Sequence, residues 1–318
     1  MPSGLRTPQW SESAKAAIAA KTGGEQARSV LADKVREASR MAAIAARSLA
    51  FGTGGAIDRR GSGALRLGGP GLWGATEKPM NDLLAFAVNA HGGLGRWNAF
   101  NRLEAEVTID GAIWHIKQQP GLLADKRVTI DTHEQRLTIA PFAGTETRSV
   151  FTGRRLVLED LTGKIVAARN NPCAAFAGHR RETPWDKFHV AYFASEALWT
   201  YLASPFLYTY PGFQSEEIEP WCENGETWRR LRVTFPNRIA SHTKVQIVHF
   251  GPDGIMRRHD YTVDILGGAA GANYPDGYRD VQGIMMPTRR RIYAYDEARR
   301  KVPEPLLVSL DFGRLVFS

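Results

Sequence analysis

One expected strand, Gly254 to Leu266, carries the residues best suited to do chemistry. Alternation along a strand puts His259, Tyr261 and Val263 on one face and Asp264 on the other. Because that face ends in apolar residues, we expect it to be the inner one. His259 and Tyr261 could then orient a ligand head group, or His259 could act as general base or acid with Tyr261 or Asp264 assisting it. The alternative is that both are hydrogen-bonded core residues without a chemical role.

Three consecutive arginines, Arg289 to Arg291, occur on another expected strand. Since strand side chains alternate between faces, at least one of them should point inward. An inward arginine could pair with an acid such as Asp264 or Glu217, or bind an anionic head group.

Signatures of common enzyme classes are missing from the sequence. It contains no G-x-S-x-G, H-E-x-x-H or G-x-x-x-x-G-K-[ST] motif, and no G-x-G-x-x-G after an expected strand. The two cysteines, Cys173 and Cys222, do not have the spacing of metal ligands. We therefore expect neither a cofactor nor a metal site, and whether the protein is an enzyme stays open.

The segment from 186 to 212 is a helix-length run crowded with aromatic residues. Its apolar side chains cover both faces of a helix, and such a helix must be covered on all sides. It is either a plain core helix or the wall of an apolar cavity. For the cavity we expect a lining of aromatic residues for apolar contact and two polar residues for orientation: Trp114, Tyr192, Phe193, Trp199, Phe206, His259 and Tyr261.

Composition divides the chain of 318 residues in two. Residues 1–79 are rich in Ala, Gly and Arg and are expected to be a disordered or partly helical tail. Most of the net charge of +8 comes from this end, because residues 1–80 hold 12 Lys/Arg against 6 Asp/Glu and the rest holds 29 against 27. We therefore expect no nucleic-acid binding by the folded domain, 80–318. The chain shows no recognisable signal peptide or membrane-spanning segment, and we expect a cytoplasmic protein.

Alternating patterns predict many strands in the domain, joined by connections too short for parallel crossovers. The clearest hairpin is expected at Asp110-Gly111, between strands 103–109 and 113–119, and others at Asn224-Gly225 and Asp253-Gly254. Strands, then helices, then more strands indicate an α+β fold. We expect one strongly curved antiparallel sheet, a half-barrel, wrapping the aromatic-rich helical insertion.

The order of these elements resembles the lipoprotein-localisation-factor superfamily and a group of uncharacterised bacterial proteins. The resemblance covers about residues 80–318 and depends on the Gly92-Gly93-x-x-x-Trp97 start and the Gly283-x-x-x-Pro287 step. It implies an antiparallel half-barrel closed by helices over a cavity for acyl chains or similar ligands. This sequence lacks the signal peptide or lipobox cysteine of exported members.

Together these patterns predict a protein that binds an apolar or amphipathic small molecule in a half-barrel cavity. Two alternatives stay open: an enzyme acting on a hydrophobic metabolite through His259 and Tyr261, and an interaction protein with a filled core.

Overall fold

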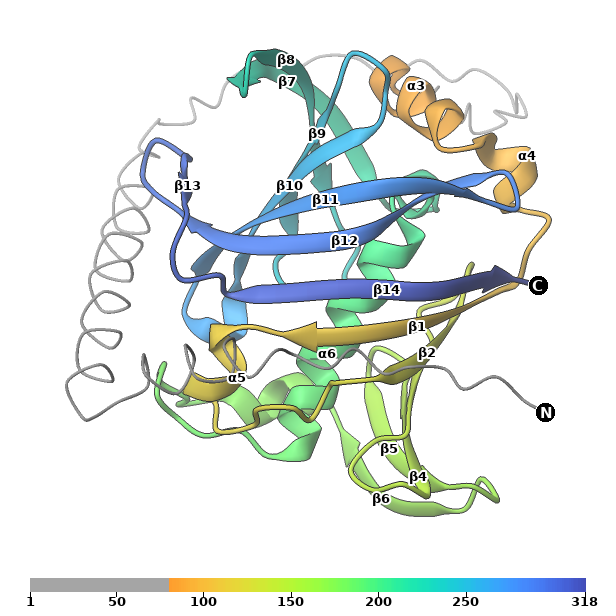
Figure 1. Cartoon of the computed structure of the whole chain (residues 1–318), viewed down its shortest axis with the longest axis vertical. Coiled ribbons are helices and arrows are strands. Elements are labelled where there is room, and N and C mark those ends of the chain that lie inside the picture. The colour runs from red at the N-terminus through yellow and green to blue at the C-terminus, as the bar shows by residue number, and fades with distance from the viewer. Residues whose placement is uncertain (1–79) are drawn as a thin grey trace, which may run out of the picture.

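A computed structural model describes residues 80–318, which form an open, strongly curved antiparallel sheet around one long helix (Figure 1). The predicted α+β half-barrel is thus confirmed. The tail predicted for residues 1–79 lies outside the described residues.

All strand pairs are antiparallel, and the sheet runs in the order β6-β5-β4-β3-β2-β1-β14-β12-β11-β10-β9-β8-β7, with β13 paired to β12. The sheet does not follow chain order at its centre, because β14 is inserted between β1 and β12. The strands are β1 Arg102–Asp110, β2 Lys126–Asp131, β3 Leu137–Ala140, β4 Thr147–Phe151, β5 Arg155–Asp160, β6 Ile165–Asn170, β7 Gln214–Glu223, β8 Glu226–Thr234, β9 Val245–Phe250, β10 Met256–Val263, β11 Ala269–Val281, β12 Ile284–Tyr295, β13 Lys301–Val302 and β14 Val308–Phe317.

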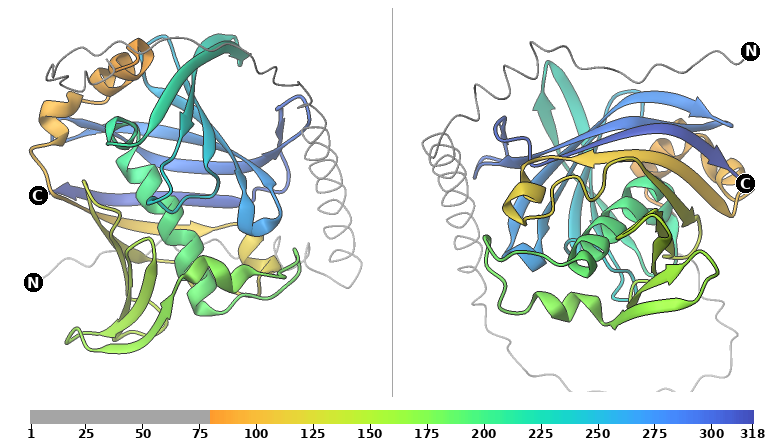
Figure 2. Two further views of the ribbon diagram at one scale, coloured as in Figure 1. Left: turned by 180° about the vertical axis from the view of Figure 1, so that it is seen from behind. Right: turned by 60° about the horizontal axis from the view of Figure 1, so that its bottom comes forward.

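The helix α6, Lys187–Ala203, crosses the concave side of the sheet (Figure 2). It begins at Asp186, whose carboxylate accepts a hydrogen bond from the backbone N–H of His189 at 2.8 Å, while the Asp186 N–H donates to His189 Nδ1 at 3.1 Å. This reciprocal cap satisfies two backbone donors at the helix start. Every residue from His189 to Ala203 is buried, which confirms that a helix apolar on both faces is covered on both.

Shorter helices lie around the rim of the sheet. They are α3 Asp82–Ala90, α4 Gly93–Trp97, α5 Ala112–Ile116, η1 Pro172–Phe176, η2 Phe206–Thr209 and η3 Asp264–Leu266. The helix α3 is capped by the Asn81 side chain.

The hairpin predicted at Asp110-Gly111 is wrong. Residues 112–116 form α5 instead of a strand, and β1 pairs with β14 and β2. The chain passes so close to β14 here that a Cβ on Gly111 would lie 2.4 Å from the carbonyl oxygen of Leu307. With both edges of β1 already paired, a hairpin partner has no free edge to join. The hairpins predicted at Asn224-Gly225 and Asp253-Gly254 are confirmed.

The strand β11 was not predicted at all. Its sequence contains Gly, Ala, Pro and Asp, which strands generally disfavour. The structure supplies a reason for Gly271, because a Cβ there would lie 2.6 Å from the Tyr261 ring. Packing against the neighbouring strand therefore outweighs intrinsic propensity in this segment.

The helix cap predicts a measurable contribution to stability. Replacing Asp186 with Ala removes the hydrogen-bond acceptor and the ion pair with Arg169, so we expect a loss of about 1–2 kcal/mol in the free energy of unfolding. Urea denaturation measures it. Asp186→Asn keeps a capping acceptor and should lose less than half as much; equal losses would show that the cap contributes nothing.

Candidate functional site

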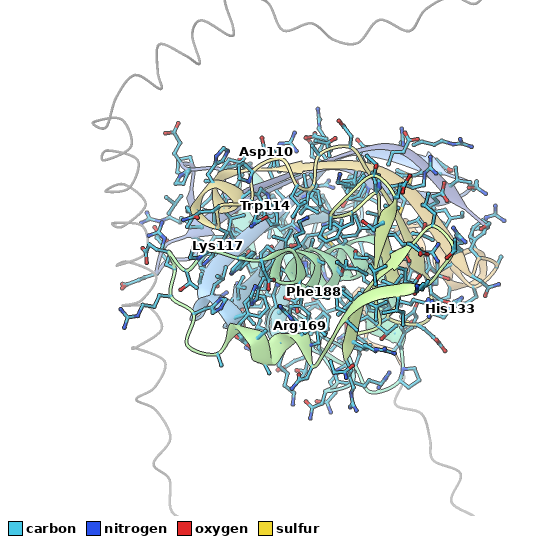
Figure 3. All side chains as sticks on the ribbon, turned by 90° about the horizontal axis from the view of Figure 1, so that it is seen from below. Asp110, Trp114, Lys117, His133, Arg169 and Phe188 are labelled. Carbon is cyan, nitrogen blue, oxygen red and sulfur yellow. The ribbon has the colours of Figure 1, made fainter. Side chains whose placement is uncertain are left out.

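An apolar pocket of about 70 Å³ lies between α6 and the inner face of the sheet. The side chains of Trp114, Phe193 and Tyr261, all three predicted to line a cavity, are part of its wall. Figure 3 shows Trp114 beside α6 in the view from below. The rest of the wall comes from α6, η3 and strands β1, β10, β11, β12 and β14, and includes Ala197, Tyr201, His242, Leu266, Gly271 and Ile292.

A buried histidine–carboxylate pair borders this pocket. His242 Nδ1 lies 2.7 Å from Glu196 Oε1, and both residues are buried. The His242 ring stacks on Phe193 with ring centroids 4.8 Å apart. Its Nε2 makes no hydrogen bond to another residue of 80–318. A carboxylate on one ring nitrogen and a free second nitrogen is an arrangement suited to proton transfer or to binding a polar ligand group.

A pair of tyrosines forms the next polar part of the wall, with the Tyr261 ring centroid 5.0 Å from that of His242. The hydroxyls of Tyr201 on α6 and Tyr261 on β10 lie 2.5 Å apart. Gly271 makes this possible, since the Tyr261 ring lies directly over it. The pair thus links the central helix to the sheet at the pocket wall.

Behind the tyrosine pair lies a second group of buried polar side chains. Arg290 Nη2 donates to the Tyr201 carbonyl at 2.8 Å, and the guanidinium lies 4.8 Å from the Tyr201 ring centre. Its Nε and Nη1 have no hydrogen-bond partner within the part of the chain described. The same holds for both amide atoms of Asn273 and for Nδ1 of His259. His259 lies directly opposite Asn273 in the β10–β11 register.

The tautomer of His259 follows from its neighbour. Gln246 Nε2 donates to the Thr243 carbonyl at 2.9 Å, so Gln246 Oε1 faces His259 Nε2 at 2.6 Å. His259 Nε2 must therefore carry the proton, and Nδ1 is a bare acceptor. Burial, with the charge of Arg290, lowers the pKa of His259 to about 3.

The tyrosines are also held in their neutral form. Burial raises the pKa of Tyr201 to about 12 and raises that of Tyr261 well above its ordinary value. At neutral pH His259 is a poor base here and Tyr261 a poor acid. This environment favours hydrogen bonding over proton transfer for the two residues in which the sequence indicated chemistry.

The other predicted site residues lie away from the pocket. The carboxylate-bearing Asp264 is exposed at the start of η3, because β10 ends at Val263, and it cannot assist His259 in the interior. Trp199 donates from Nε1 to the Asp131 carbonyl at 2.9 Å, and Phe206 stacks on Trp97 at 4.4 Å. Tyr192 packs against Phe151 and Phe176. His259 does not line the pocket, and its ring packs against the rings of Tyr201 and Tyr261.

Sequence reasoning missed four polar residues of this region: Glu196, His242, Gln246 and Asn273. For Glu196 a signal was available, since an acid in the middle of an otherwise apolar helix must have a buried partner. His242 lies in a loop and Asn273 on the unpredicted strand β11, so no periodic pattern pointed to either.

Two larger hollows, of about 720 and 450 Å³, lie over strands β1 to β5 and are lined mainly by charged and hydroxyl side chains. Within residues 80–318 no group of three His, Cys, Asp or Glu side chains is placed to hold a metal ion. None of the helices described there is long and apolar enough to span a membrane.

Solved structures with a similar chain path exist. A LolA superfamily protein from Nitrosomonas europaea matches 74% of this chain and 92% of its own, with 11% identity and a TM-score of 0.42. A DUF1329 family protein from Desulfovibrio piger gives the same values. An outer membrane lipoprotein-sorting protein domain, so described, from Vibrio parahaemolyticus matches 74% of this chain and 91% of its own, with 10% identity and a TM-score of 0.43.

These matches include a member of the superfamily that the order of elements resembles, and at such identities and TM-scores the similarity concerns the path of the chain alone. No protein-family model matches the sequence, and no curated protein matches it either.

The contact between Gly271 and Tyr261 generates a prediction about packing. Gly271→Ala should displace the Tyr261 ring from its partner Tyr201 and lower the free energy of unfolding by about 1–3 kcal/mol, as overpacking does. Gly95→Ala is the matched control, because a Cβ at Gly95 meets nothing within 4 Å. Thermal and urea denaturation compare the two; equal stabilities would contradict the close approach.

Buried neutral histidines predict sensitivity to acid. The folded-state pKa values of His259 and His91, about 3 and about 4, lie below the 6.5 of an unfolded histidine. The unfolded state therefore binds more protons below pH 6.5, and stability should fall by about 1.4 kcal/mol per histidine per pH unit as the pH decreases toward 4.

Denaturation in urea between pH 7 and pH 5 tests this expectation. His259→Gln should reduce the slope of unfolding free energy against pH by about one proton. Asp260, whose pKa burial raises to about 6, acts in the opposite direction, but equally in both proteins. An unchanged slope would show that the pKa of His259 is the same in the folded and the unfolded protein.

Proposed function

We propose that this protein binds an apolar or amphipathic small molecule between α6 and the curved sheet. The observation that carries the proposal is the pocket wall, which is almost entirely apolar and has a few convergent polar groups, His242, Tyr201 and Tyr261. Small-molecule sites have this composition: apolar surface supplies contact and a few polar groups fix orientation.

The pocket must enlarge to hold such a ligand. Its volume of about 70 Å³ is room for about two water molecules, whereas ligand pockets measure about 300–1,000 Å³. The segment we expect to move is η3 with the two residues that follow it. Leu266 is half-buried at the pocket wall, and Gly267 and Gly268 both have positive φ. In that conformation glycine has backbone freedom that other residues lack.

Filling the pocket tests the proposal. The full chain, freed of bound lipid by denaturing extraction and refolding, is incubated with a mixed lipid extract and examined by native mass spectrometry. We expect bound lipid-sized molecules. Ala197→Phe, which places a ring in the pocket, should reduce binding at least about tenfold, since it replaces ligand contact surface.

The control for this experiment is Ala177→Phe, at an exposed alanine outside the pocket, which should bind as the unchanged protein does. A protein that binds nothing from the extract while remaining folded would contradict the proposal and favour the interaction protein with a filled core.

A second candidate function is an enzyme that acts on a hydrophobic metabolite in the same pocket. The Glu196–His242 pair favours it, because a carboxylate that orients a histidine is a common general-base arrangement. In this candidate function the Glu196–His242 pair has the acid–base role that the sequence predicted for His259 and Tyr261. Asp264 is too exposed to share in it.

Loss of His242 separates the two functions. His242→Ala should reduce turnover of a lipid-extract component by about 10²–10⁴ if the pair catalyses, while affinity stays within about tenfold. Product formation is followed by mass spectrometry. Equal product with both proteins would rule out catalysis by His242.

We place the protein in the cytoplasm as a prediction. Cys173 and Cys222 are both free and exposed, which suits a reducing compartment. Cell fractionation of the source organism decides it.

A further inference from the structure

A buried positive charge without a counter-charge lies next to the pocket. Arg290 is about 1% exposed, and no carboxylate forms an ion pair with it within residues 80–318. The side chains that face it are neutral: Tyr201, Tyr208, Tyr261, Tyr278, His91 and His259. Burying a charge costs free energy unless an opposite charge pairs with it. This arrangement therefore favours the binding of an anion beside Arg290.

A second buried arginine, Arg258, differs from Arg290 because carboxylates and a carbonyl accept hydrogen bonds from its guanidinium. Arg258, on the outer face of β10, is also fully buried. It binds Asp260 through two hydrogen bonds of 2.6 and 3.1 Å, Glu223 at 2.8 Å and the Arg299 carbonyl at 2.6 Å. Within residues 80–318, Arg290 donates one hydrogen bond, to the Tyr201 carbonyl on α6, and its Nε and Nη1 have no hydrogen-bond partner.

A second buried side chain with hydrogen-bond donors, Asn273, lies close to Arg290. Asn273 is opposite Ile292 in the β11–β12 register, so Asn273 and Arg290 are diagonal neighbours on the inner face. Diagonal neighbours are about 7–8 Å apart along the sheet, within reach of an arginine side chain. Asn273 is fully buried, and its amide nitrogen faces the Tyr201 hydroxyl without forming a well-aligned hydrogen bond to it; like Arg290 Nε and Nη1, it is a donor without a hydrogen-bond partner in residues 80–318. Planar donors of this kind match the two oxygens of a carboxylate.

We propose that Arg290 and Asn273 bind the carboxylate of an amphipathic ligand whose apolar chain fills the pocket between α6 and the sheet. The inference deepens the proposed function and depends on it. The head group reaches these donors when the Tyr201–Tyr261 hydrogen bond opens, and the freed hydroxyls remain beside it as further donors. His259 Nδ1, a bare acceptor, then has a tyrosine hydroxyl or a water within its surroundings to accept from.

The alternative is that Arg290 serves structure alone, as a cation at the C-terminal end of α6. That role uses one nitrogen and leaves Nε and Nη1 unexplained. It predicts no preference for an acidic ligand, so the two roles can be separated by experiment.

Matched ligands provide the test. Equilibrium dialysis of the full chain at pH 7.4, below the aggregation concentration of each ligand, compares radiolabelled hexadecanoate with 1-hexadecanol. The two share the chain and differ in charge. We expect the acid to bind at least about tenfold more tightly, the difference made by one charge-assisted hydrogen-bonded pair.

Two variants test whether Arg290 and Asn273 recognise the carboxylate of the ligand. Arg290→Gln should abolish the preference for the acid. Asn273→Asp provides an internal carboxylate beside Arg290, so it should keep or raise the melting temperature and also abolish the preference, even if Arg290→Gln does not fold. Arg289→Gln is the control, because that neighbouring arginine is exposed and paired with Asp276; it should keep the preference.

Each outcome has one meaning. If neither ligand binds, the carboxylate site for such a chain is overturned, and the lipid-extract experiment alone decides the proposed function. Equal binding of acid and alcohol supports the pocket and overturns the carboxylate site. A preference that survives in Asn273→Asp, or a melting temperature lowered by that substitution, overturns the assignment to Arg290 and Asn273.

Discussion

The burial of α6 on all sides from His189 to Ala203 is the constraint on which the rest of the structure depends. A helix with aromatic and aliphatic side chains on every face cannot rest on a flat sheet, because one side would face water. The sheet curves around it, and the rim helices and loops cover what remains (Figure 2). The pocket exists for the same reason: it is the place where the curved sheet and the straight helix fail to fill the space between them completely.

The same burial explains why polar chemistry is concentrated beside α6. Glu196 and the hydroxyl of Tyr201 enter the core with the helix, and each meets one partner from the sheet side, His242 or Tyr261. Arg290 is the exception, since its one hydrogen bond within residues 80–318 is to a backbone carbonyl. Arg258, on the outer face of β10, is paired with two carboxylates, whereas Arg290 Nε and Nη1 have no partner in residues 80–318, which supports the carboxylate site we propose.

Much of the fold could be predicted because alternation and capping are local signals. The hairpins at Asn224-Gly225 and Asp253-Gly254 and the helix within the segment from 186 to 212 are as expected. The predictions of strands fail where tertiary packing, and not the local sequence pattern, determines the secondary structure. Residues 113–119 have strand-like composition, but both edges of β1 are taken, and β11 is a strand despite its Gly and Pro because it must pass under Tyr261. His259 and Tyr261 point inward as predicted, whereas their partners Gln246 and Tyr201 are determined by tertiary contacts that no spacing encodes.

The position of β14 has a consequence for the order in which the chain can fold. Strands β1 to β6 form one meander and β7 to β12 another, and only β14 joins them, through β1 on one side and β12 on the other. During synthesis both meanders emerge before the strand that links them, each with an unpaired edge. Pairing β1 with β14 closes a loop of about two hundred residues, so assembly of the continuous sheet is a late and slow event. Until then part of the apolar surface of α6 lacks its cover, and exposed apolar surface in a partly folded chain favours aggregation.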